Sequence, residues 1–284
     1  MLIYFFMKTN LILFLLLFTG INSSLAQTYE LGLNYYPHKF LLTNEADRIT
    51  GSGYTEILPN ILSGTSFGVF FNKNLNPQNG LQFDLNFLHQ RQYYLYTALS
   101  NNTSSIFTSL NSINLNISHN LYLWDYENND NVFFSYGLSL MNIINSTDYY
   151  SVETENKSNG VTQKETRTTI IENGDYVSAS VVTRNDSIIS VSGDARQGDP
   201  RYKSFNIGAN VGLNFLHYFN DNVAFTAGVK GVYYFLNPEN RGSNLWDQNS
   251  KYKYGNIPTS DKREASKLYS YGVSLSLIYC FGRY

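Results

Sequence analysis

The sequence predicts an all-β fold, an eight-stranded antiparallel up-and-down transmembrane β-barrel. Three observations lead to this prediction. Stretches of alternating apolar and polar residues recur along the chain, the connections between them alternate between short and long, and no long apolar run follows residue 26. Strict alternation indicates strands with two unlike faces. A chain that crosses a membrane with such strands must close them into a barrel, because an open sheet edge cannot face lipid.

The alternation is clearest in the stretch SFNIGANVGLNF, from Ser204 to Phe215. Every second residue from Phe205 is apolar, and Ser, Asn or Gly occupies the positions between them. Seven further stretches follow the same pattern with few exceptions. The eight predicted strands cover residues 29–36, 66–71, 81–87, 112–118, 134–140, 204–215, 223–230 and 269–281.

The composition of the polar faces indicates which face points outward. They carry Gly, Ser, Asn and Thr, and their few charges are Glu30, Asp84 and Lys230. A face exposed to water is normally richer in Lys, Glu and Arg, whereas small polar residues suit a narrow, crowded interior. We therefore expect the polar faces to line the lumen, which eight strands leave just wide enough for side chains, and the apolar faces to meet lipid.

The connections predict how the barrel is oriented. Turn-forming residues make short links before Leu81, Val132 and Val223, and longer polar segments cover 43–62, about 97–105, 146–203 and 236–267. Short periplasmic turns and long extracellular loops are typical of outer-membrane barrels. The longest loop, 146–203, has turn signals near Gly174 and Asn185, which predict a β-hairpin with a further short strand above the membrane.

Aromatic residues gather near both predicted ends of the strands, as expected of side chains at the two interfaces of a bilayer. The high β-propensity of aromatic residues is the alternative explanation. The cluster beside the short turns comprises Tyr122, Trp124, Phe215, Tyr218, Phe219, Phe225, Tyr279 and Phe281. The cluster beside the long loops comprises Tyr93, Tyr94, Tyr96, Tyr233, Tyr234, Phe235 and Tyr269.

The first 26 residues have the features of a signal peptide. Lys8 precedes an apolar run from Leu11 to Phe18, and Ser24-Leu25-Ala26 places small residues where a signal peptidase cleaves. Translation starts at Met1 or at Met7. We predict a mature barrel domain of residues 27–284; an uncleaved membrane helix is the alternative, although the run is short of the ~20 residues that span a bilayer. The single cysteine, Cys280, excludes an intrachain disulfide.

The chain closes with YGVSLSLIYCFGRY, an alternating strand that ends on the aromatic Tyr284. With the signal peptide, the strand pattern and the unequal connections, this segment makes residues 27–284 resemble the small OmpA/OmpX-like outer-membrane barrels, in particular the Bacteroidetes-type proteins with an outer membrane protein beta-barrel domain. The resemblance implies a location in the bacterial outer membrane. It also implies recognition of the last strand by the barrel-assembly machinery.

The histidines are the residues to weigh for catalysis, because some small barrels are enzymes that use His near one rim. His119 and His217 fall near the short-turn ends among aromatic residues, where an interfacial ring explains them. His38 and His89 lie toward the outer rim, where either could form an acid–base pair with Asp84 or a loop serine. We expect no enzymatic activity, and a rim enzyme that modifies lipid A or cleaves peptides stays the alternative.

The three lumen-facing charges are the other candidate site. A buried charge without a partner is costly, so we expect Glu30, Asp84 and Lys230 to pair with one another; a gate or ligand contact in a narrow pore is the alternative. The acidic turn at 125–131 lacks the Gly and closing Glu of a calcium-binding EF-hand loop. We predict no metal or cofactor, and Cys280 falls on the lumenal face.

The overall composition limits the function. The chain has a net charge of -2 with 15% charged residues and no basic patch, which excludes a nucleic-acid partner. We expect the barrel to anchor extracellular loops that bind an extracellular or secretion-system partner, with outer-membrane lipids around the wall. A rim enzyme, a narrow pore and a soluble exported β-sandwich or lipid-binding barrel are the alternatives.

Overall fold

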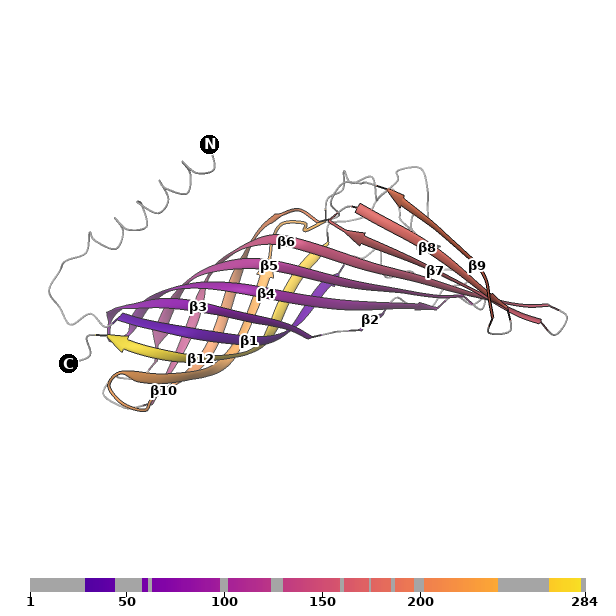
Figure 1. The fold of residues 1–284 in the computed structure, drawn as a ribbon. Coiled ribbons are helices and arrows are strands. Elements are labelled where there is room, and N and C mark those ends of the chain that lie inside the picture. The colour runs from indigo at the N-terminus through magenta and orange to yellow at the C-terminus, as the bar shows by residue number, and fades with distance from the viewer. Residues whose placement is uncertain are drawn as a thin grey trace, which may run out of the picture.

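The computed structural model describes residues 29–43, 58–60, 63–97, 102–123, 130–158, 161–173, 175–184, 187–196, 202–239 and 266–281. All of its named elements are strands (Figure 1). They are β1 (Tyr29–Thr43), β2 (Leu58–Asn60), β3 (Ser63–Asn76), β4 (Asn79–Thr97), β5 (Asn102–Tyr122), β6 (Asp130–Ser158), β7 (Val161–Glu172), β8 (Asp175–Arg184), β9 (Ser187–Arg196), β10 (Phe205–Tyr218), β11 (Val223–Tyr234) and β12 (Lys267–Phe281). Within the described residues, no helix is long and apolar enough to cross a bilayer.

Eight of these strands form a closed antiparallel barrel, as the sequence predicts. The order is β10–β11–β12–β1–β3–β4–β5–β6, and β6 pairs with β10 to close the ring. The last strand lies against the first, where Phe281 is opposite Tyr29. We call the end with the turns at 77–78 and 219–222 the periplasmic end and the opposite end the extracellular end; the predicted short turn at 125–129 lies outside the described residues.

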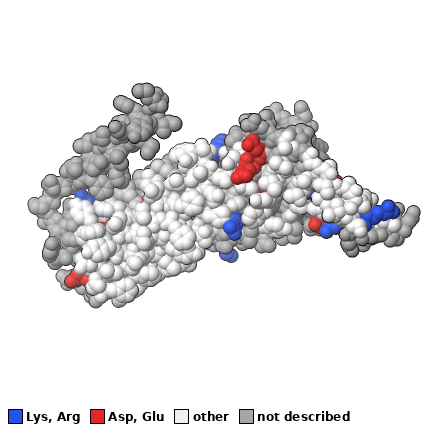
Figure 2. Space-filling model, in the orientation of Figure 1, with Lys and Arg blue, Asp and Glu red and all other residues white. Residues whose placement is uncertain are grey.

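The two faces of the wall have the polarity that the sequence predicts. On β10, Val211, Leu213 and Phe215 are 44–48% exposed on the outside, whereas Asn206 and Asn210 are at most 3% exposed inside. Leu31, Leu33, Phe67, Leu85 and Val273 are similarly exposed on other strands. A water-soluble fold buries its large apolar side chains, so this arrangement is inverted and fits a lipid surrounding. Figure 2 shows this wall almost free of charged residues.

Three aromatic residues differ from the belt prediction. Tyr122, Tyr218 and Tyr234 point into the lumen, where each is at most 4% exposed. Each occupies an inward position in the alternation of its strand; Tyr122, for example, continues the inward series of Asn114, Asn116 and Asn120. The large rings fill the barrel near its ends. Phe215, Phe219, Phe235, Tyr233, Tyr279 and Phe281 face outward as expected. The side chains of Tyr94, Tyr96 and Trp124 lie outside the described residues.

Apolar side chains fill the lumen at both ends. The extracellular cluster contains Phe40, Leu42, Leu110, Met141, Ile143, Tyr202, Val232, Tyr234 and Leu268. The periplasmic cluster contains Phe70, Tyr122, Phe133, Leu216, Tyr218, Ala224, Ile278 and Cys280. Every member is at most 8% exposed. The lumen therefore has a polar middle between two apolar layers.

The strands β4, β5 and β6 continue well past the barrel, with lengths of 19, 21 and 29 residues. β6 then pairs with β7, β7 with β8 and β8 with β9, so a sheet extends beyond the extracellular end (Figure 1). The strands β7, β8 and β9 lie where the sequence predicts a hairpin and a further strand. The predicted strands stop short of the observed ones at residues 87, 112 and 140, because β4 and β6 end later and β5 begins earlier in the chain. The alternation loses its apolar face there, where the wall leaves the bilayer. Gly174 and Asn185 lie outside the described residues, and Asn173, which precedes Gly174, has a φ of 50°.

An arginine on the outer wall tests whether that wall faces lipid. We expect Leu85→Arg, at a side chain 52% exposed on the barrel, to destabilise the inserted protein by about 2–4 kcal/mol, the cost of a cationic residue near the bilayer midplane. The matched control is Val191→Arg, at a side chain 67% exposed on β9, which should be neutral. Urea titration in vesicles, followed by heat-modifiable gel migration, measures both. Equal stability of the two variants would contradict the lipid-facing assignment.

Candidate functional site

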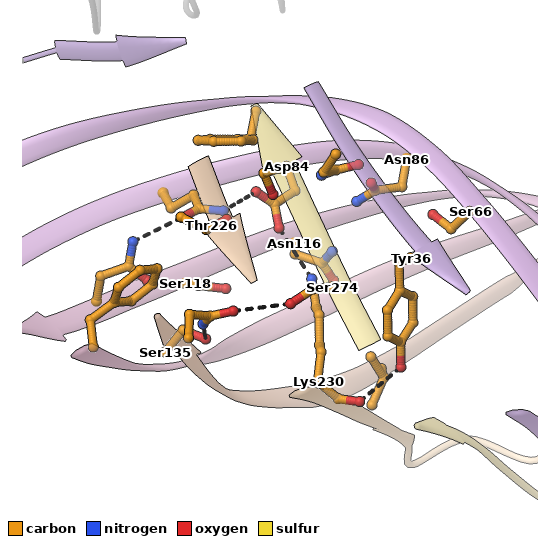
Figure 3. A pocket seen from close by; sticks show the side chains of 18 of the residues that line it. Tyr36, Ser66, Asp84, Asn86, Asn116, Ser118, Ser135, Thr226, Lys230 and Ser274 are labelled. Carbon is orange, nitrogen blue, oxygen red and sulfur yellow. Dashed lines mark hydrogen bonds and ion pairs between the residues drawn. The ribbon is translucent and has the colours of Figure 1, made fainter. Parts of the chain in front are cut away.

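The polar middle of the lumen contains a cavity of about 60 Å³ between the two apolar clusters. Its lining comes from every strand of the barrel and includes Asp84, Asn86, Asn116, Lys230 and Ser274 (Figure 3). A water molecule needs roughly 10–15 Å³ of such volume, so the cavity holds a few waters and no organic ligand of ordinary size.

An ion pair crosses this cavity. Lys230 Nζ on β11 lies 3.2 Å from Asp84 Oδ2 on β4, and the two side chains are 18% and 3% exposed. Gln82 Nε2 donates to the other carboxylate oxygen at 2.5 Å, and the Tyr36 hydroxyl donates to the Lys230 carbonyl at 2.9 Å. The pair joins opposite walls of the barrel, and it compensates two charges that would be costly alone in the lumen.

Glu30 belongs to a separate network at the periplasmic end. Its carboxylate accepts hydrogen bonds from Asn72 Nδ2 at 2.8 Å, from Asn74 Nδ2 at 2.9 Å and from the Tyr218 hydroxyl at 3.4 Å. The structure thus brings Asp84 and Lys230 together, and it holds Glu30 among amides and hydroxyls instead. The amides Asn72 and Asn74 were not singled out from the sequence; their position in line with the inward residues of β3 is the signal that could have found them.

The two outer-rim histidines lie on opposite faces of the wall. His38 is 3% exposed in the lumen, where Nδ1 lies 2.9 Å from the Tyr36 carbonyl and the ring stacks on Tyr36. His89 is on the outer face, with Nδ1 2.5 Å from Asn111 Oδ1 and Nε2 accepting from Arg91 Nε at 2.6 Å. The acid–base pair with Asp84, which the sequence leaves open as an alternative, does not form, because Asp84 contacts Lys230 and Gln82.

The other two histidines lie on the outer wall near the periplasmic end. His217 Nδ1 is 2.6 Å from Asp130 Oδ1, and its ring meets Phe219 edge-on at 5.1 Å. The rings of His119 and Tyr136 are 5.2 Å apart. Both positions agree with the interfacial role predicted for them. Cys280 is buried in the periplasmic cluster, and the described residues contain no group of three or more His, Cys, Asp or Glu that could hold a metal ion.

Comparison with known proteins finds likeness in fold. Neither protein-family models nor curated proteins match the sequence. Among solved structures, the barrel is similar to Ail, the attachment invasion locus protein of Yersinia pestis, at 8% identity and a TM-score of 0.35, covering 90% of this chain and 99% of that one. It is similar to OprG from Pseudomonas aeruginosa, at 10% identity and a TM-score of 0.37, covering 90% of this chain and 95% of that one. It is also similar to the outer membrane protease OmpT from Escherichia coli, at 12% identity and a TM-score of 0.41, covering 90% of this chain and 96% of that one.

These likenesses are all below a TM-score of 0.5, so the class of the protein rests on its own strand order and inverted faces. A closed antiparallel ring of eight strands, apolar outside and polar inside, defines an outer-membrane β-barrel protein. The bilayer that surrounds it is the bacterial outer membrane.

Removing one partner of the lumenal ion pair should be costly. We expect Asp84→Asn to lower the free energy of unfolding by about 3 kcal/mol, because Lys230 would keep a buried charge without its carboxylate. The double variant Asp84→Asn with Lys230→Met should recover most of that loss. Urea unfolding in detergent micelles measures all three proteins. A double variant no more stable than Asp84→Asn would show that the pair contributes no coupling.

Proposed function

We propose that the protein is an outer-membrane anchor that presents its extracellular sheet, β7–β9, to a protein partner at the cell surface. The observation that carries the proposal is the exposure of apolar side chains on this sheet, beyond the lipid-facing wall. Val177 is 56% exposed, Ile188 is 68% exposed and Val191 is 67% exposed. Apolar groups that stay in water in a folded protein mark interaction sites.

The sheet has a rigid connection to the barrel. Phe107 on β5 pairs with Tyr149 on β6, Tyr149 with Ile170 on β7, and Ile170 with Val177 on β8. This row gives one continuous apolar face, in which the rings of Phe107 and Tyr149 lie 5.8 Å apart. Because β5 and β6 are also barrel strands, the membrane anchor fixes the direction in which the face points.

The strand β9 supplies an open edge. Among the described residues it pairs with β8 alone, and the ladder is interrupted between Val182 and Thr183. Unpaired backbone groups on an edge strand can accept a strand from another chain, and alternate side chains then give specificity. We therefore infer that the partner adds an extended segment along β9 and covers Val191.

The contacts of the histidines favour this role over the rim-enzyme alternative. His38 is buried against Tyr36, and both ring nitrogens of His89 have protein partners. We propose no catalytic activity for this chain.

The apolar clusters at both ends of the lumen favour the anchor over the narrow pore. We expect planar-bilayer recordings to show no steady conductance for the wild-type protein, because Phe40, Leu110, Met141 and Leu268 fill the extracellular end at 0% exposure. A regular, voltage-independent single-channel step from the reconstituted protein would contradict the closed lumen and restore the pore alternative.

A single introduced cysteine tests the proposed contact, because Cys280 is buried and reacts poorly. We expect Val191→Cys to give a discrete adduct with a short thiol crosslinker on intact cells. Adding Val177→Lys should abolish the adduct, because the partner would have to bury the charge of the lysine. Adding Ser192→Lys, on the opposite face of β9, should leave the adduct unchanged. The readout is an immunoblot of the boiled protein.

Heat-modifiable migration of each variant shows whether the barrel is folded. No adduct from folded Val191→Cys protein, or an adduct unchanged by Val177→Lys, would remove the proposed contact. An adduct of twice the chain's mass would identify the partner as a second copy.

A further inference from the structure

We propose that the outer wall carries a binding site for the phosphate groups of outer-leaflet lipid headgroups, formed by Arg91 and Lys39 and positioned by His89. This site is separate from the extracellular sheet, and it rests on the location, orientation and charge of these residues.

The site begins where the apolar wall ends. Phe67, Phe87 and Ile113 form one outward row across β3, β4 and β5, and the next outward row is Thr65, His89 and Asn111. The change from apolar to polar therefore occurs at the same register on three neighbouring strands. On β1, the stretch from Tyr29 to Lys39 contains eleven residues, which matches the 9–11 residues of a tilted strand that cross the hydrocarbon. Lys39 and His89 thus lie at headgroup level.

The Arg91 side chain is held by its neighbours. Arg91 Nε donates to His89 Nε2 at 2.6 Å, so the other imidazole nitrogen carries the proton and donates to Asn111 Oδ1 at 2.5 Å. This chain of two hydrogen bonds uses the inner nitrogen of the guanidinium, Nε, so its terminal nitrogens remain available to a ligand. Arg91 is exposed, and a planar guanidinium held in this way can bind two phosphate oxygens at once.

A second cation lies close by on the same wall. Lys39 on β1 is exposed and pairs in register with Ser63 on β3, two residues before the Thr65 that pairs with His89. Lys39 and Arg91 are therefore two strands apart, about 10 Å at the usual strand spacing. Two cations at this separation suit two phosphate groups, either on separate lipids or on a single lipid headgroup.

Among the described residues, the outward neighbours of Arg91 in its row carry no carboxylate on the next two strands. Arg91 pairs with Ser109, Ser109 with Thr147, and Thr147 with Glu172, so the carboxylate in this row is three strands, roughly 14 Å, from Arg91. Lys39 pairs with Tyr271 on its other side, where an aromatic ring suits the same interface. Anionic lipid headgroups attract cations at the membrane surface, and here an apolar wall lies directly below to receive the acyl chains.

Native mass spectrometry of the full chain in detergent micelles tests the site. The probes are a diphosphorylated lipid A, the same lipid without phosphates, and inorganic phosphate. We expect wild-type protein to bind the phosphorylated lipid at least ten times more tightly than the phosphate-free lipid. Millimolar inorganic phosphate should not displace it, because the acyl chains contribute on the wall.

Four variants separate the roles of the residues. Arg91→Gln should weaken binding of the phosphorylated lipid about tenfold, and Lys39→Gln should also weaken it. His89→Leu should reduce the affinity several-fold, because Arg91 would no longer be held in place. Arg91→Lys should not restore the affinity that Arg91→Gln loses, because only a held guanidinium binds bidentately. The matched control, Arg184→Gln on the exposed end of β8, should bind as wild type.

Heat-modifiable migration shows that each variant is folded before binding is measured. Equal affinity for the phosphorylated and phosphate-free lipids would overturn the proposal, as would unchanged binding by folded Arg91→Gln protein. Complete displacement by inorganic phosphate would also overturn it, since the site would then bind a free anion and not a lipid.

Discussion

The fold depends on one constraint: in hydrocarbon, every backbone amide and carbonyl must find its partner within the protein. The pairing of β6 with β10 meets this constraint by closing the ring of eight strands. Closure then fixes which residues can lie where. Leu, Val, Ile and Phe occupy the outside because lipid surrounds it, and Asn, Ser and Gly occupy much of the narrow inside.

The same closure explains the arrangement of the lumen. Its polar amides and hydroxyls hydrogen-bond from strand to strand, as Asn210 on β10 does with Ser139 on β6 and with Ser118 on β5. The Asp84–Lys230 ion pair ties opposite walls in the middle, and apolar clusters fill both ends. A barrel filled in this way is a stable anchor, and the surfaces that remain for recognition are the outer wall and the sheet that extends from β6.

Much of the barrel could be predicted from the sequence because its signal is local. Alternation with a period of two identifies both the strands and their faces, as at Phe205–Phe215, and the turn signals near Gly174 and Asn185 predict the extension. The inward rings of Tyr122, Tyr218 and Tyr234 were missed because an aromatic residue near a strand end satisfies either face. The position of the residue in the alternation of its strand decides which face it takes.

The contacts of the lumenal site could be predicted only in part, because they join strands far apart in the chain. The cost of a lone buried charge predicts that Lys230 meets Asp84, but not that Glu30 meets Asn72 instead, since this depends on the stagger between strands. The Arg91–His89–Asn111 chain was also missed, because the predicted strands ended near residues 87 and 112. Both outcomes have the same cause: alternation specifies a face, and register specifies a partner.

Depth-dependent quenching tests the central claim, that acyl chains contact the apolar outer face. A single tryptophan at position 213, in a background where Trp124 and Trp246 are replaced by Phe, is refolded into vesicles of lipid brominated near the chain ends. Strong quenching of Leu213→Trp, together with no quenching of Val191→Trp on the extracellular sheet, is the predicted result. An unquenched Leu213→Trp in a folded barrel would contradict the account.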